Sequence, residues 1–270
     1  MPRAAARLLP VAVVIVALAP LYVALVGSLT PDARLFESVP LVPAPLVWDH
    51  YRALFGTRGF WVPIGNSLIV ATATTLLALL LGAPCAYALA RLRFRGSAMV
   101  LALVLAVSML PQISIVPPLF LLLRGVGLLD TRAGLVLPYL TFAMPLTIWF
   151  LVTVFRRVPA EIEEAAMMDG ASRLVAFRRI VLPLAAPGLA TTALLAFLYS
   201  WNEFLFALTF TLGPDRHTVP VAIALFRGQY QVPWGEVLAA ATVATLPVAI
   251  VVLVAQRRLV SGLTAGGVKG

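Results

Sequence analysis

The sequence predicts an all-α integral membrane protein with six transmembrane helices, and three observations support this fold class. Of the 270 residues, 61% are hydrophobic and only 11% are charged, which is too apolar for a soluble domain of this length. Six segments without a charged residue are each long enough to cross a hydrocarbon core, which takes about 20 apolar residues in a helix. The charged residues lie between these segments, as expected of loops that set membrane topology.

Two of the six segments are longer than a single crossing requires. Their helices are therefore expected to begin after Pro63 and near Ala98. The first segment, which follows Arg3 and Arg7, also resembles a signal peptide, but its long uncharged run suits an uncleaved helix better. In chain order the predicted spans are residues 8–29, 59–90, 96–123, 133–155, 180–202 with its continuation, and 237–256.

The distribution of basic residues predicts the topology. With the N-terminus inside, most of the 20 Lys and Arg residues fall on the cytoplasmic side, so the positive-inside rule favours two cytoplasmic termini. The expected organisation is an N-terminal helix over 1–30, an extracytoplasmic loop over 31–62, a core over 63–260 whose five helices include a cytoplasmic loop at 158–183, and a cytoplasmic tail over 261–270.

Several classes of function are disfavoured by composition. The net charge of +9 is spread among apolar segments and forms no clustered basic patch, so nucleic-acid binding is not expected. His50 and His217 are far apart and lack partners at metal-ligand spacing, which predicts surface loop positions for both and no metal site. Cys85 is the only cysteine, so no intrachain disulfide can form. The only lysine, Lys269, precedes Gly270, so the chain has no P-loop for ATP.

The segment 158–183 is longer than two antiparallel helices need for a connection. Pro159 suits the first turn of a short helix, and Glu161, Glu163 and Glu164 place negative charge at its positive end. Gly170 supplies the unrestricted backbone that helix ends favour. A first short helix that ends near Gly170 is therefore predicted.

A second short helix should follow, capped by Ser172. Leu174, Phe177 and Val181 recur at helical spacing and would form one apolar face, with arginines on the remaining surface. Such a helix could lie on the membrane surface or bind a protein partner. The residues by themselves leave both interpretations open.

The spacing within this loop resembles the signature loop of ABC importer permeases. The pattern has Glu-Ala-Ala, a glycine after three residues and Ile-x-Leu-Pro after nine more, and it is matched by Glu164, Ala165, Ala166, Gly170, Ile180, Leu182 and Pro183. The similarity extends from about Asn66 to the C-terminus through PCAYALARLRFRG, MLPQISIVPP, WNEF and GLTAGGVKG. These stretches are most similar to the carbohydrate-uptake branch, and the tail is similar to the smaller permease of maltose-type systems.

The resemblance implies a type I importer fold in the inner membrane of a bacterial or archaeal cell. It implies that the loop docks on a separate ATPase through the residues just named together with Leu174 and Phe177, so the chain itself is not an enzyme and binds no cofactor. ATP and Mg would be used by two copies of the ATP-binding subunit. A second permease, an extracytoplasmic solute-binding protein and membrane lipid are the other implied partners. The implied substrate is a sugar or oligosaccharide, with a sugar phosphate or a polyol as alternatives.

A second group of polar residues is a candidate for the substrate pathway. Glu203 is the one acidic residue within a predicted span, and Trp201 and Asn202 add stackable and hydrogen-bonding surface suited to sugars. The alternative is that Asn202 and Glu203 hydrogen-bond to a partner permease or lie at the outer interface. Asn66 is a weaker candidate, because it is expected to cap or bridge helices.

The main competing interpretation is a secondary transporter, which would also place polar residues in mid-membrane. The long loop at 158–183 and the lack of an ion-site cluster beside Glu203 argue against it. A structural or assembly role in the membrane has no supporting motif. Prolines 111, 117, 118, 138 and 145 could be hinges that line a cavity or simple packing kinks.

Overall fold

A computed structural model describes residues 3–37, 42, 45–92, 94–226 and 232–266, with side chains from Leu9 to Gln256 apart from the same gaps. No β-strand occurs within these residues. Four helices are long and apolar enough to cross a membrane, and each matches a predicted span. They are α1 (Arg3–Ser28), α3 (Trp61–Arg91), α6 (Arg132–Arg157) and α13 (Trp234–Gly266).

The two remaining predicted spans are bent helix pairs. The first joins α4 (Ser97–Ser108) to α5 (Gln112–Gly125) at 90°. Pro111 stands at the N-cap of α5 with an extended backbone, which ends α4 because proline cannot continue the hydrogen-bond ladder. If each bent pair is one span, the described chain has up to six.

The second bent pair changes the predicted start of the fifth span. Residues Arg173–Leu184 meet α10 (Ala186–Trp201) at 77°, so the break lies at Ala185 and not at residue 180. The expected start of the second span is also wrong, because α3 begins at Trp61 and contains Pro63. Proline is tolerated there because the N–H groups of a first helical turn have no partner within the helix.

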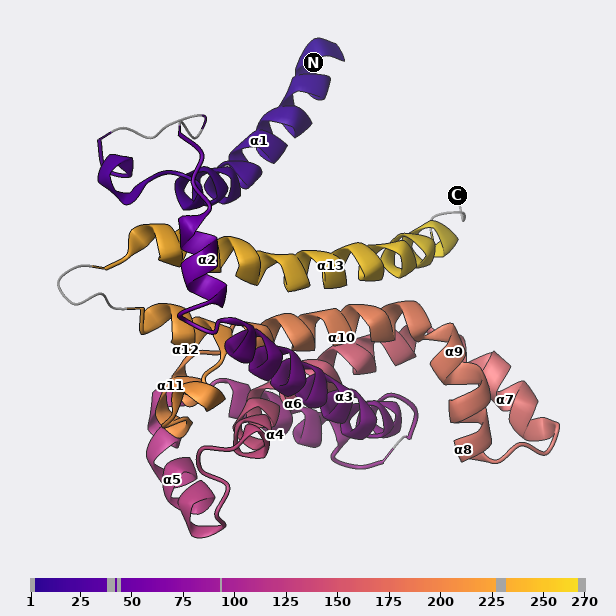
Figure 1. The fold of residues 1–270 in the computed structure, drawn as a ribbon. Coiled ribbons are helices and arrows are strands. Elements are labelled where there is room, and N and C mark those ends of the chain that lie inside the picture. The colour runs from indigo at the N-terminus through magenta and orange to yellow at the C-terminus, as the bar shows by residue number, and fades with distance from the viewer. Residues whose placement is uncertain (1–2, 38–41, 43–44, 93, 227–231, 267–270) are drawn as a thin grey trace.

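The core of the bundle is built on α3 and α6, whose contact is the most extensive in the chain, with α10 packed against both. Figure 1 shows these three helices together, with α13 running alongside α10. By contrast, α1 projects away from the bundle and touches it mainly through α13. Its large side chains from Leu9 to Leu25 are therefore mostly exposed.

Short helices occupy the two ends of the bundle. One end carries η1 (Asp32–Arg34), α2 (Asp49–Phe55), α11 (Leu205–Phe210), η3 (Pro214–Arg216) and α12 (Val219–Ala224). The other carries α7 (Ala160–Met168), α8 (Arg173–Ala176), a π-helix (Phe177–Val181) and α9 (Leu182–Leu184). In Figure 1 the end of α13 lies toward the same end of the bundle as α7, α8 and α9.

The expected surface position of His50 is wrong. Its side chain is buried where α2 packs on α13, and Nε2 lies 3.1 Å from the Thr30 carbonyl oxygen. A Cβ added to Gly235 would lie 2.2 Å from the His50 ring, so α13 can approach this closely only because residue 235 has no side chain. His217, in contrast, is half-buried in the connection between η3 and α12.

Candidate functional site

The loop between α6 and α10 contains the two short helices that the sequence predicts. Pro159 is the N-cap of α7, and Glu161 and Glu163 lie in its first turn. The helix ends at Met168, and Gly170, two residues later, has a φ of +91°, the left-handed conformation. The Gly170 amide donates to Met167 (3.1 Å) and the Ala171 amide to Ala166 (3.0 Å), the paired bonds of a Schellman end. A side chain at position 170 would be strained.

The second half of the loop differs from the expected single apolar face. Ser172 caps α8 by accepting the Val175 amide at 3.4 Å, as predicted. Leu174, however, is 63% exposed, whereas Phe177 is 6% exposed and Val181 is fully buried. Leu174 lies in α8, before the π-helix that begins at Phe177, and it is the π-helix that packs on the core through Phe177 and Val181.

Most of the loop residues expected to bind a partner face outward. Glu164, Ala165, Gly170, Leu174 and Pro183 are exposed, and Ala166, Ile180 and Leu182 are half-buried. Apolar side chains protrude beside them, including Met168 at 84% exposed. Phe177 is the exception, because it is buried in the chain's own core and cannot contact a partner directly.

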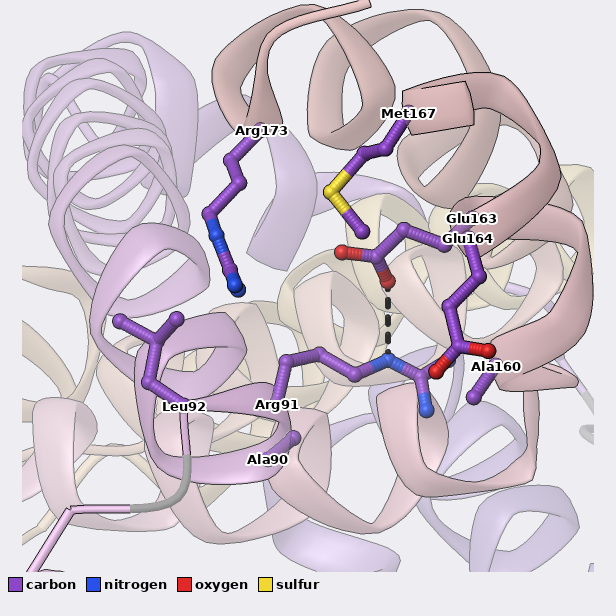
Figure 2. A pocket seen from close by; sticks show the side chains of 8 residues that line it. All are labelled: Ala90, Arg91, Leu92, Ala160, Glu163, Glu164, Met167 and Arg173. Carbon is purple, nitrogen blue, oxygen red and sulfur yellow. Dashed lines mark ion pairs between the residues drawn. The ribbon is translucent and has the colours of Figure 1, made fainter. Parts of the chain in front are cut away.

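Glu163, one residue before Glu164, is buried and joins the loop to α3. The Tyr87 hydroxyl donates to Glu163 Oε1, and Arg91 Nε forms an ion pair with Glu163 Oε2 at 3.1 Å. A second Arg91 nitrogen donates to the Val158 carbonyl at 2.5 Å, directly after α6. Figure 2 shows the Arg91–Glu163 pair from close by. We call Tyr87, Arg91 and Glu163 the loop anchor.

The loop anchor is not among the site residues predicted from the sequence. Tyr87 and Arg91 are four residues apart in the last turns of α3 and so share one helix face, which is a readable signal for a common partner. Their partner lies more than seventy residues later, and nothing in a single sequence distinguishes Glu163 from its neighbours Glu161 and Glu164. Burial makes the distinction, since Glu163 is only 4% exposed.

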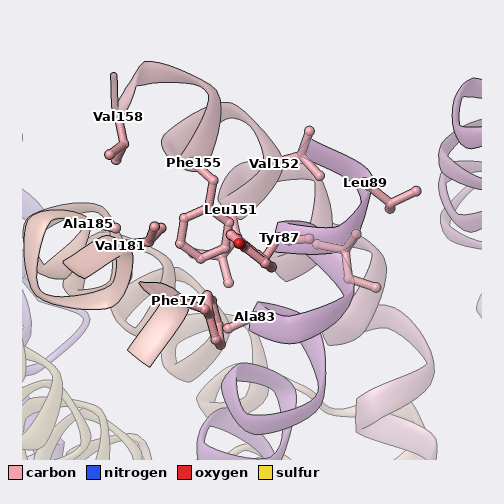
Figure 3. Packing of buried hydrophobic residues seen from close by; sticks show 12 residues of the cluster. Ala83, Tyr87, Leu89, Leu151, Val152, Phe155, Val158, Phe177, Val181 and Ala185 are labelled. Carbon is pink, nitrogen blue, oxygen red and sulfur yellow. The ribbon is translucent and has the colours of Figure 1, made fainter. Parts of the chain in front are cut away.

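The π-helix packs on the same part of α3. The Phe177 ring lies 4.6 Å from the Tyr87 ring, and the Phe155 ring stands edge-on to Phe177 at 6.0 Å. Figure 3 shows these rings within one apolar cluster with Val181 and Ala185. Aromatic pairs at these separations stabilise the fold by more than the apolar area they bury would give. The base of the loop is therefore held by α3 and α6.

An open pocket of about 570 Å³ lies between the end of α3 and the loop. Its charged lining carries both signs, with Glu163 and Glu164 opposite Arg91 and Arg173 (Figure 2). Within the described residues, no group of three or more His, Cys, Asp or Glu side chains is arranged to hold a metal ion. Charged groups of both signs and apolar side chains thus lie side by side in this pocket.

The second candidate group lies where α10 gives way to α11. Glu203 is 6% exposed, and its carboxylate accepts the amides of Phe206 (2.8 Å) and Ala207 (3.1 Å). It therefore caps α11 in the manner of an N-terminal carboxylate. Trp201 is buried and stacked on Phe197, with ring centroids 5.8 Å apart. Asn202 is exposed, and its side chain donates to the Leu198 carbonyl.

Asn66 has the geometry of a bridge between helices. Its side-chain nitrogen donates to the carbonyls of Asp215 (2.8 Å) and His217 (2.9 Å), and its oxygen accepts from Arg132 Nε at 2.8 Å. The residue is fully buried. It joins α3, α6 and the segment around η3, and no hydrogen bond of the described residues links it to Trp201, Asn202 or Glu203.

Comparison with known proteins gives consistent matches along most of the chain. A family model described as "Binding-protein-dependent transport system inner membrane component" matches residues 78–265. The trehalose transport system permease protein SugB of Mycobacterium tuberculosis is 45% identical over 245 residues, which is 90% of this chain and 89% of the relative. The trehalose/maltose transport system permease protein MalG of Thermococcus litoralis is 40% identical over 259 residues, covering 95% and 93%.

A third relative and a solved structure extend the pattern. The sulfoquinovosyl glycerol transport system permease protein SmoH of Agrobacterium fabrum is 40% identical over 237 residues, covering 85% of this chain and 83% of the relative. The fold is similar to a chain of a bacterial ABC transporter involved in the import of the acidic polysaccharide alginate, with a TM-score of 0.78, 24% identity and 94% of each chain covered.

Proposed function

Because this chain belongs to the binding-protein-dependent transport system inner membrane components, a family of ABC importer permeases, we propose that it forms the transmembrane path for a sugar or oligosaccharide. Alternating access between inward-open and outward-open states would move the substrate. The substrate class is supported by relatives that are 40% to 45% identical, which are named as permease proteins of transport systems for trehalose, maltose or sulfoquinovosyl glycerol. A sugar phosphate or a polyol is the alternative substrate.

The observation that carries this proposal is the outward-facing surface of the loop between α6 and α10. Glu164, Gly170 and Leu174 are exposed at one end of the bundle, while Phe177 and Glu163 hold the base of the loop. The exposed charges of the loop carry both signs, with Glu164 and Asp169 near Arg173, Arg178 and Arg179 in sequence, and a mixed surface of this kind suits a protein partner with complementary charges.

The partner in this proposal is an ABC ATP-binding subunit, present in two copies. Glu164, Ala165, Ala166, Gly170, Leu174, Ile180, Leu182 and Pro183 would form the contact, and Phe177 would support it from beneath. ATP and Mg are used in that partner, since this chain's only lysine is outside any P-loop pattern. A second permease would complete the membrane part, and lipid would cover the exposed apolar helices.

The topology in this proposal has six spans of the type I importer fold, in the membrane of a bacterial or archaeal cell. Both termini and the loop at 158–183 would be cytoplasmic, which agrees with the end of α13 lying toward the same end of the bundle as α7 to α9. The opposite end, with η1, α2 and η3, would face the solute-binding protein. One solved neighbour is an alginate transporter in complex with its substrate-loaded periplasmic protein. The tail's last residues, 267–270, and Lys269 among them, lie outside the described residues.

The substrate path is proposed to run beside α10 and α11. Of the four candidates, Asn202 has an exposed side chain, whereas Trp201, Glu203 and Asn66 are buried and engaged within this chain. Asn202 is therefore the residue we expect to meet substrate, and the other three would shape the wall behind it. Replacing Asn202 by Ala should raise the substrate concentration needed for half-maximal uptake without changing assembly.

The test is uptake by the complete transporter in proteoliposomes. The chain is co-purified with its second permease and ATPase, and the solute-binding protein is added outside with radiolabelled trehalose or maltose. We expect uptake that requires both ATP inside and the binding protein outside. Uptake driven by a proton or sodium gradient without ATP would contradict the proposal and favour a secondary transporter.

A further inference from the structure

Both halves of the loop converge on one side chain of α3. The hydroxyl of Tyr87 contacts Glu163, which belongs to α7. The ring of the same residue contacts Phe177, which belongs to the π-helix. Gly170 separates these two halves, and α7 also contacts α8 and the π-helix directly. Tyr87 is thus a common attachment point that fixes both halves of the loop to α3.

Arg91 adds a third element to the same point. It lies one turn beyond Tyr87 on the same face of α3, and its guanidinium is shared between Glu163 of α7 and the Val158 carbonyl that follows α6. The ends of α3 and α6 and the start of α7 are therefore held by one cation. Arginine suits this position because its planar group presents several donors in fixed directions.

We propose that the loop anchor, Tyr87 with Arg91 and Glu163, makes the loop move as one body with α3, so that movement imposed on the loop reaches the membrane core. The proposal rests on the proposed function, since it needs a partner that moves the loop. It assigns positioning residues that do not touch the partner or the substrate. Their effect is on how much transport each hydrolysed ATP produces.

Burial is the reason that these three polar groups matter more than an ordinary surface contact. Arg91 and Glu163 have side chains that are only 12% and 5% exposed, so water screens their pairing little. An arrangement that separates one partner leaves the other buried without compensation, which is costly. The three groups together therefore favour the single geometry in which all of them are paired. The apolar contacts of Val181 hold the loop against the core without setting its direction, because the hydrophobic effect is non-directional.

The experiment measures substrate transported per ATP hydrolysed by the complete transporter in proteoliposomes. Tyr87→Phe keeps the ring on Phe177 and removes only the hydroxyl, and Glu163→Gln keeps the shape and removes the charge. We expect each variant to assemble and hydrolyse ATP while the transport-to-ATP ratio falls roughly tenfold, as loss of a charged hydrogen bond would give. The matched control is Glu161→Gln, an exposed glutamate in the same first turn of α7, which should keep the wild-type ratio.

A double variant separates the anchor from general damage. If Tyr87 and Glu163 act through one contact, the combined Tyr87→Phe and Glu163→Gln change should lower the ratio no further than the worse single change. Arg91→Lys should give a smaller fall, because lysine keeps the charge but cannot hold Glu163 and Val158 with a planar fork.

The outcomes distinguish the anchor from the proposed function. If the wild-type complex shows no ATP-dependent uptake, the proposed function fails. If the wild type transports and the anchor variants keep its transport-to-ATP ratio, the anchor proposal is overturned. Loss of assembly in every anchor variant would also contradict the proposal, since the three residues would then serve folding alone.

Discussion

The loop between α6 and α10 and the junction between α10 and α11 both carry polar residues, but they use them differently. In the loop, Glu164 and Gly170 are exposed and make no hydrogen bond to the core of the bundle among those described. At the junction, Glu203 is buried and accepts hydrogen bonds from two backbone amides. Asn66, which lies elsewhere, also has both its side-chain nitrogen and its side-chain oxygen hydrogen-bonded within the chain. The two regions thus differ in what they leave free for other molecules.

The difference shows that the role of a polar residue in an apolar chain depends on the hydrogen-bond partners that the fold places around it. An unpaired Glu203 would be free to bind a substrate, but its carboxylate already accepts hydrogen bonds from backbone amides in the first turn of α11. Glu164 has no such partner inside the described chain and remains available. Substitutions should therefore affect stability at the junction and partner binding at the loop.

The largest loss of stability is expected for Glu203→Ala. The change leaves the buried amides of Phe206 and Ala207 without an acceptor, which should lower the free energy of unfolding by about 3 kcal/mol. Thermal unfolding of the purified chain in detergent measures this, with the neighbouring exposed Asn202→Ala as a control within about 0.5 kcal/mol of wild type. Unchanged stability with abolished uptake would instead make Glu203 a substrate ligand.

A smaller loss is expected for Asn66→Ala. It removes the link between α3, Arg132 and the carbonyls beside η3, which should cost about 2 kcal/mol. The adjacent Gly65→Ala is a matched control, because a Cβ there meets nothing within 4 Å and alanine favours the helix. If the two variants unfolded at the same temperature, Asn66 would not be a structural bridge.

A pH effect smaller still is expected from His217, outside the spans. Burial lowers the pKa of His217, against the opposing effect of Asp130, so the folded state prefers the neutral ring. Below about pH 6.5 the unfolded chain takes up a proton that the folded chain resists, and stability falls as the pH is lowered. His217→Gln should reduce the difference in unfolding temperature between neutral and mildly acidic buffer. If mildly acidic buffer instead raised the unfolding temperature of the wild type, and His217→Gln removed that rise, the prediction would be wrong.

Much of the fold could be predicted because its strongest signals are local. Uninterrupted apolar runs gave α1, α3, α6 and α13, and Pro159, Gly170 and Ser172 gave the two short helices of the loop. The bends at Pro111 and Ala185 were harder to predict. Proline at 111 permits a break without setting its angle, and Ala185, at the 77° turn, is buried in a cluster with residues of α3 and α6 that are distant in sequence.

The candidate site could be predicted only in part. The expected apolar face failed at Leu174, which is exposed on α8 while Phe177 and Val181 are buried, because a periodic pattern does not show which of its members packs on the core. The importance of Glu163 was missed because its partners, Tyr87 and Arg91, are distant in sequence. Asn66 and His50 show the same limit, since their partners come from segments that only the folded chain brings together.

The central claim, that the loop binds an ATPase, is tested most directly by Glu164→Lys. Glu164 is exposed, so the charge reversal should leave the free energy of unfolding within about 0.5 kcal/mol of wild type. Co-purification of the ATP-binding subunit with the affinity-tagged permease should nevertheless be lost, while Asp49→Lys, an exposed change in α2, should retain it. An ATPase that still co-purifies with Glu164→Lys in wild-type amount would contradict this account of the loop.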